Sequence, residues 1–170
     1  MRIGKIRVLQ LKKEYLENLE GQNELTKIVD GKIACEEEVS YSEGEYNIND
    51  IAVEASYCDL YLGDNLKNKK MISDMFLGEE EFNGQEYGFD DVCVSFKCLQ
   101  PERVKEIVSE FDKESIMGTF KELEKELNKI GIFTDGLDEK NDLKLLDDMM
   151  NIFQTADKEN TGVLYIMEMQ

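Results

Sequence analysis

The stretch DVCVSFKCLQPERVKEIVSEF, from Asp91 to Phe111, decides the fold. Its first part alternates apolar with other side chains, as a β-strand does. The apolar positions of this strand are Val92, Val94, Phe96 and Cys98. Pro101 then suits the first turn of a helix, whose apolar positions form one stripe at i, i+3, i+4 and i+7. These positions are Val104, Ile107, Val108 and Phe111. The pattern predicts a strand followed by a helix that packs against the sheet.

Two more amphipathic helices are predicted downstream. The first ends before Gly131, and its apolar side chains recur at steps of four, three, four and three: Ile116, Phe120, Leu123, Leu127 and Ile130. Only two heptads are present, so the spacing favours packing in a core over a coiled coil. The second helix, at about 143–156, has a broad apolar stripe and is expected to be largely buried. The final VLYIMEM, residues 163–169, is branched and aromatic and predicts a closing strand.

Upstream, the same periods predict a strand and several short helices. Residues 3–11, IGKIRVLQL, alternate as a short strand, and residues 11–29 carry two short helical patterns separated at Gly21. A buried helix is predicted with Asn49 as its cap and Gly63 as its end. Its stripe is Ile51, Ala55, Cys58 and Leu62. Another short helix should end at Gly78, with a stripe formed by Met71 or Ile72, Met75 and Phe76.

The remaining segments, 30–49 and 79–91, are predicted as connections. The first contains Glu36 to Glu38, which repel one another, and is typical of a solvated loop. The second contains Asn83-Gly84 and Gly88, which predict a loop or hairpin turn. With 170 residues and 41% apolar content, the chain can bury one sizeable core. We therefore predict a single domain, 1–170, of the α+β class, with a small sheet packed against several amphipathic helices.

The chain is strongly acidic, with 38 acidic and 20 basic side chains and a formal charge of −18 at pH 7. The charge is spread along the chain, which is typical of a solubilising surface. A field of this sign repels phosphate backbones and anionic lipid, so direct binding to nucleic acid or membrane is disfavoured. There is no secretory leader and no stretch of about 20 apolar residues, so we expect a cytoplasmic protein.

Histidine is absent, which excludes Ser-His-Asp and Cys-His catalysis and disfavours zinc sites of the catalytic kind. General acid-base catalysis would have to use Asp, Glu, Lys or Tyr. The four cysteines lack CxxC spacing and are expected to be reduced, buried small apolar side chains. They are Cys35, Cys58, Cys93 and Cys98. The sequence singles out no catalytic, cofactor-binding or metal-binding residue, and it predicts no cofactor.

One stretch, DKENTGVLYIME from Asp157 to Glu168, has part of the spacing of an EF-hand calcium loop. The residues that match are Asp157, Gly162, Leu164 and Glu168. Glu159 and Thr161 suit the third and fifth positions poorly, and only two residues follow Glu168, too few for an exiting helix. The favoured interpretation is a polar helix end, with Asn160 or Gly162 left-handed, turning into the closing strand. Whether the stretch binds a cation stays open at this point.

Three blocks resemble, in this order, the uncharacterised bacterial YfbM-like family. They are MISDMFLGEEEF (71–82), YGFDDVCVSFKCLQPERVKEIVSEF (87–111) and LLDDMMNIFQTADKENTGVLYIMEM (145–169). The resemblance implies an α+β domain in which a Pro-led helix follows a strand and the last helix turns into a terminal strand. Around residues 51–63 the family often has a Trp and a His, where this chain has Ala55 and Asp59. The family has no assigned activity, so the resemblance implies no catalytic residue.

Two classes of function remain. The first is an acidic binding or regulatory module that contacts another, basic protein. A variant is a nucleic-acid mimic that inhibits a DNA-binding protein, which requires carboxylates spaced along one face like phosphates. The second class is a carboxylate-based hydrolase or transferase, with Mg²⁺ as an optional cofactor, whose acidic groups converge in a concave pocket. The binding module is favoured over an enzyme, as a monomer or homodimer.

Overall fold

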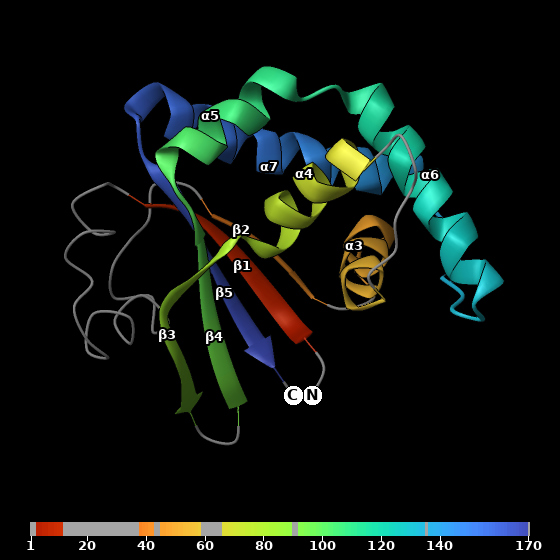
Figure 1. Cartoon of the computed structure of the whole chain (residues 1–170), viewed down its shortest axis with the longest axis horizontal. Coiled ribbons are helices and arrows are strands. Elements are labelled where there is room, and N and C mark those ends of the chain that lie inside the picture. The colour runs from red at the N-terminus through yellow and green to blue at the C-terminus, as the bar shows by residue number, and fades with distance from the viewer. Residues whose placement is uncertain are drawn as a thin grey trace.

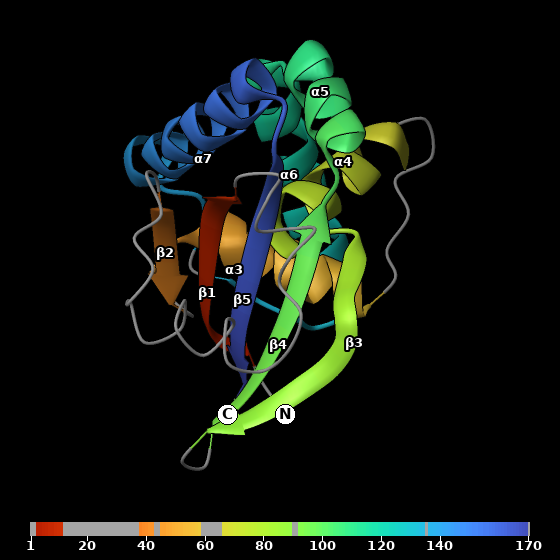
Figure 2. The same cartoon turned by 90° about the vertical axis from the view of Figure 1, so that its left-hand side faces the viewer.

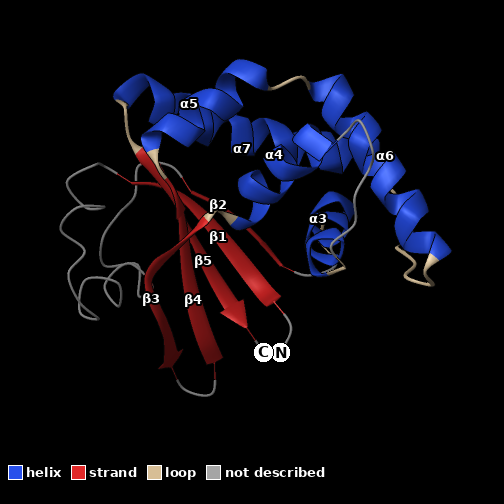
Figure 3. Cartoon of the chain, in the orientation of Figure 1, coloured by secondary structure: helices blue, strands red, loops and turns tan. Residues whose placement is uncertain are grey.

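The computed structural model describes residues 3–11, 38–42, 45–58, 66–89, 92–134 and 136–169. Within these ranges, five strands form one sheet in the order β2-β1-β5-β4-β3, and every pairing is antiparallel (Figure 3). The strands are β1 (Ile3–Leu11), β2 (Glu38–Ser42), β3 (Glu80–Phe89), β4 (Val92–Leu99) and β5 (Gly162–Met169). The helices are α3 (Asn47–Tyr57), α4 (Leu66–Leu77), α5 (Pro101–Glu110), α6 (Lys113–Lys129) and α7 (Glu139–Glu159). The predicted α+β class is confirmed.

The described helices all lie on one side of the sheet, above one face and one end of it (Figures 1 and 2). Helices α5 and α7 pack together, and α6 packs on α3 and α4. The described part of the chain contains no helix with the length and apolar content to span a bilayer. The helices predicted around 104–111, 116–130 and 143–156 are confirmed as α5, α6 and α7, and the one ending at Gly78 is confirmed as α4.

The last strand of the chain, β5, is the central strand of the sheet. It pairs with β1 on one side and with β4 on the other. Residues 162–167 of β5 are all buried, whichever face they point to. The predicted closing strand is therefore confirmed, and its unbroken apolar run is explained because both of its faces are covered.

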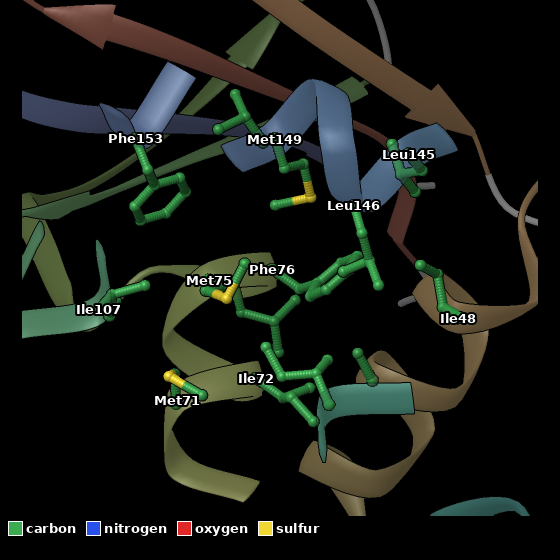
Figure 4. Packing of buried hydrophobic residues seen from close by; sticks show 14 of the residues in the cluster. Ile48, Met71, Ile72, Met75, Phe76, Ile107, Leu145, Leu146, Met149 and Phe153 are labelled. Carbon is green, nitrogen blue, oxygen red and sulfur yellow. The ribbon is translucent and has the colours of Figure 1, made fainter. Parts of the chain in front are cut away.

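Between the helices and the sheet lies one apolar core. Its largest members include Phe76 of α4, which packs edge-on against Phe120 of α6 with 5.7 Å between ring centroids. Met75 and Phe76 also lie opposite Met149 and Phe153 of α7 (Figure 4). A buried side chain of this size contributes about 1.5 to 3 kcal/mol. The methionines of α4, Met71 and Met75, fill space in this core.

Two buried tyrosines of the sheet cap the end of α4. The hydroxyl of Tyr41 donates to the carbonyl oxygen of Phe76 at 3.1 Å, and that of Tyr165 donates to Met75 at 2.7 Å. These carbonyls lie in the last turn of the helix, where no intrahelical donor reaches them. Burial raises the pKa of the Tyr41 hydroxyl and that of Tyr165 far above the ordinary value. The hydroxyl groups are therefore protonated donors at neutral pH.

A buried carboxylate joins the beginnings of α3 and α7. Asp142, which is fully buried, accepts from the backbone N–H of Asp138 at 2.9 Å and from that of Ile48 at 3.5 Å. Both N–H groups lie at helix N-termini, where a negative charge is favourable. The predicted cap of α3, Asn49, is wrong: it lies inside the helix, and its Oδ1 has no hydrogen-bond partner among the described residues.

The face of the sheet turned away from the described helices is also apolar. Cross-strand pairs place Phe96 beside Ile166 and Cys98 beside Leu164, on the face opposite Tyr165. These four side chains, together with Leu9 and Val94, are at most 2% exposed. The central strands are therefore buried on both faces. The helix predicted to end at Gly63 is α3, but α3 ends at Tyr57 with Cys58 as its C-cap, so the predicted end is wrong. Of the two helical patterns predicted in 11–29, Leu11 lies in β1 and the rest lies outside the described residues.

Two predicted loops are wrong in part. Residues 38–42 form the edge strand β2, whose Tyr41 enters the core despite the preceding glutamates. Asn83-Gly84 lies inside β3, where the register shifts between Glu81 and Glu86. Glycine in a strand often marks such an irregularity. Phe89 pairs with Val92, so the chain reverses at the end of the predicted segment.

Candidate functional site

Helix α5 carries a row of glutamates on its outer side. Glu102, Glu106 and Glu110 are exposed and follow one another at intervals of four residues. Because a helix rises about 1.5 Å per residue, their backbone positions are about 6 Å apart. The opposite side holds Val104 and Ile107, both fully buried. Core packing therefore fixes which side of α5 faces out and presents the three carboxylates along one line.

A network of ion pairs anchors the start of α5 to α4. The carboxylate of Asp74, whose side chain is 7% exposed, is 2.9 Å from Lys70 Nζ and 2.8 Å from Arg103 Nη2. Arg103 Nη1 also lies 2.9 Å from Glu106 Oε2. Arg103 thus neutralises part of the charge at the middle of the glutamate row. The network also restricts the rotation of α5 about its axis.

The cations of this network are permanently charged at neutral pH. Burial lowers the pKa of Arg103 and that of Lys70, but their carboxylate partners outweigh burial through hydrogen bonds and charge. The net result is a pKa above the ordinary value for both groups. The network is therefore a structural anchor.

A groove of about 570 Å³ runs between α6 and α7. It is lined by Lys113, Glu114, Met117, Gly118 and Lys121 of α6 and by Glu139 and Leu143 of α7. Ion pairs bridge the two helices at both of its ends: Lys113 Nζ lies 2.7 Å from Asp147 Oδ1, and Lys121 Nζ lies 3.3 Å from Glu139 Oε1. Its volume suits a small ligand or an inserted side chain.

The suspected calcium loop does not form in the structure. Helix α7 ends with Asn160 in the left-handed conformation, at φ 54°. Glu168 lies in β5, where it pairs with Lys5 and Val94 across the neighbouring strands. In an EF-hand, the glutamate at position 12 must lie close enough to position 1 to bind the same ion. A glutamate within a strand that leads away from the helix end cannot do so. The favoured interpretation, a polar helix end that turns into a strand, is confirmed.

The cysteines and carboxylates form no metal centre in the part of the chain that is described. Cys98 is buried and Cys58 is half-buried. Cys35 and the side chain of Cys93 do not belong to the described part of the structure. Among the described residues, no three Cys, Asp or Glu side chains come together in a way that suits a metal ion. The hydrolase or transferase alternative stays a prediction.

Sequence reasoning named no site residue, although one signal was present. Once the buried stripe of α5 is known, the glutamates in PERVKEIVSE fall on the opposite side of the helix. The row could therefore have been predicted from the sequence. The groove was not, because it depends on how α6 and α7 lie beside each other.

Among solved structures, the fold matches that of a protein of unknown function, YfbM from Escherichia coli, with a TM-score of 0.55. The match covers 96% of this chain and 99% of YfbM at 13% sequence identity. At this identity the likeness concerns the fold, and the predicted structural resemblance to YfbM is confirmed. The sequence matches no family profile and no curated protein.

Proposed function

We propose that this protein is a cytoplasmic binding module that contacts a basic protein through the glutamate row of α5. The observation that carries the proposal is the line of exposed carboxylates at Glu102, Glu106 and Glu110. Like charges four residues apart destabilise a helix by about 0.2 to 0.5 kcal/mol per pair. A partner that places Lys or Arg side chains opposite the row relieves the part of this repulsion that remains beside Arg103.

The net charge and the rigidity of α5 both support such a contact. A charge of −18 draws a basic partner toward the molecule and raises the association rate. The buried Val104 and Ile107 and the ion pair between Arg103 and Asp74 hold α5 in place before binding. A helix that is already ordered loses little conformational entropy when the partner docks.

The test uses a helical peptide with lysines at i, i+4 and i+8, and its scrambled counterpart with the same charge. The row variant replaces Glu102, Glu106 and Glu110 with Gln, and the control variant replaces Glu38, Glu45 and Glu54. We expect the row variant to bind the spaced peptide at least tenfold more weakly and the control to change less than threefold, by fluorescence anisotropy at 50 mM and 200 mM salt. Equal losses in the two variants, or no preference for the spaced peptide, contradict the proposal.

The regular spacing of the row also favours a narrower candidate, in which the basic partner is a DNA-binding protein. Carboxylates about 6 Å apart along a straight helix offer a line of negative charge to a surface that normally holds phosphates. Added protein should displace a labelled duplex from a histone-like DNA-binding protein, and the row variant should not. Equal displacement by the unchanged protein and by the row variant would mean that net charge alone is responsible.

A further inference from the structure

We propose that two copies of this chain associate through the outer stripe of α6, packed antiparallel about a two-fold axis between Lys121 and Glu122. This surface is distinct from the glutamate row of α5. The inference follows from the charge of α6, the order of that charge along the helix, and a glycine that the monomer does not require.

Helix α6 is electrically neutral in a strongly acidic chain. Its sequence, KESIMGTFKELEKELNK, contains four lysines and four glutamates, whereas the whole chain carries −18. Two copies of an acidic protein repel each other over most of their surfaces, because like charges face one another. The repulsion is smallest where two neutral helices meet.

The charges at the two ends of the stripe are complementary under the proposed axis. The stripe consists of the exposed residues Glu114, Gly118, Lys121, Glu122, Lys125 and Lys129. At about 100° per residue, these positions fall within a sector of about 100° on one side of the helix. The axis pairs Glu114 with Lys129 of the second copy, and this contact occurs twice and joins opposite charges, as an isologous interface requires. Residues beside the axis face their own copies, and Lys121 is neutralised there by Glu139 of its own chain.

Gly118 lies opposite Lys125 of the second copy in this register. A Cβ added at Gly118 would meet no atom of the described residues within 4 Å, so packing within this part of the chain gives no reason for a glycine. Inside a helix, glycine is about 0.5 to 1 kcal/mol less favourable than alanine. The missing side chain leaves room for the aliphatic stem of Lys125, which can lie over Met117 in the groove. Its ammonium then reaches the exposed Glu139, at the edge of that groove.

The ends of the stripe add apolar contact. Phe133, just beyond α6, is 77% exposed. In the antiparallel arrangement it lies next to the beginning of the second copy's α6, at both ends of the interface. Burial of large apolar side chains at these positions supplies the hydrophobic contact that complementary charges alone do not provide.

The test is a charge-swap experiment in solution, read by sedimentation velocity over a range of protein concentrations. The wild-type chain should approach twice its monomer mass of 19.6 kDa as the concentration rises. Glu114→Lys places Lys against Lys at both ends, and Lys129→Glu places Glu against Glu, so each variant should stay monomeric. Both sites are exposed, and circular dichroism melting should show that both variants remain folded.

Two combinations restore the complementary pairs. The double variant Glu114→Lys with Lys129→Glu should dimerise again, and an equimolar mixture of the two single variants should form a heterodimer. Gly118→Leu should abolish the dimer while raising the melting temperature of the monomer. A wild-type chain that stays monomeric up to millimolar concentration overturns the proposal. So does a mixture of the single variants that fails to associate.

Discussion

Glycine is required at position 78 for two reasons, the backbone conformation and the close approach of neighbouring side chains. It follows the last turn of α4 with φ at 75°, and its N–H donates to the carbonyl oxygen of Asp74. A Cβ at this position would lie 2.9 Å from Lys97 Cβ and 2.9 Å from a ring carbon of Tyr165. The sequence predicted the helix end, but not the close approach of the sheet.

We predict that Gly78→Ala lowers the free energy of unfolding by about 2 to 4 kcal/mol, measured by urea denaturation. The left-handed backbone contributes about 1 to 2 kcal/mol of this loss, and the steric overlap contributes the rest. Gly118→Ala is the matched control, because it adds the same methyl group in open space on a helix. The control should stabilise the protein slightly. A loss below about 1 kcal/mol at Gly78 would mean that β5 shifts easily to make room.

At the scale of the element, the end of α4 depends on the hydroxyl groups of Tyr41 in β2 and Tyr165 in β5, which donate hydrogen bonds to its last carbonyl groups. Burial raises the pKa of each of these groups in the folded protein. In the unfolded chain, tyrosine ionises at about pH 10. Below that pH both states are protonated and the stabilisation is complete. Above it the unfolded state releases protons that the folded state retains, so stability is lost as the pH rises.

The free energy of unfolding should therefore fall steeply above pH 10, by about 1.4 kcal/mol per pH unit for each buried tyrosine. Urea denaturation between pH 9 and 11 measures this slope. Tyr165→Phe should lower stability at pH 8 and should also remove about half of the alkaline slope. Tyr57→Phe, at a site that is 63% exposed, should leave the slope unchanged. An identical slope in the Tyr165 variant would place the alkaline loss elsewhere.

The sequence predicted those elements whose packing repeats with a regular period. Helices α5, α6 and α7 each have an apolar stripe against the core, so period and burial agree. Strand β2 was missed because its five residues carry only two inward side chains, preceded by charges. In β3, the Asn83-Gly84 pair has the chemistry of a turn, but tertiary pairing with β4 keeps it within a strand.

The candidate site was less accessible to sequence reasoning than the fold. A row such as Glu102, Glu106 and Glu110 has meaning only after the buried side of its helix is known. The cap at Asp142 depends on the meeting of two helices that lie far apart in the sequence. No local pattern encodes such a meeting. The sequence could therefore predict which side of one helix faces outward, but it could not predict how two helices lie against each other.

On the scale of the whole molecule, a charge of −18 acts against the compact state. Folding brings 38 acidic side chains together with only 20 basic ones, and the excess negative charges repel one another at short range. The described ion pairs offset this repulsion only in part. Most of them lie at the surface, where each contributes less than about 1 kcal/mol.

Salt should therefore stabilise this protein. At about 0.1 M ionic strength the Debye length is about 10 Å, so the long-range repulsion is screened, while contacts as close as that of Asp74 with Arg103 are screened less. We predict that the melting temperature rises by several degrees between 10 mM and 300 mM sodium chloride, as measured by circular dichroism at a concentration where the chain is monomeric. Sodium perchlorate at the same ionic strength is the control, because screening depends on ionic strength and not on the identity of the anion. A melting temperature that falls with both salts would mean that surface ion pairs outweigh the net repulsion.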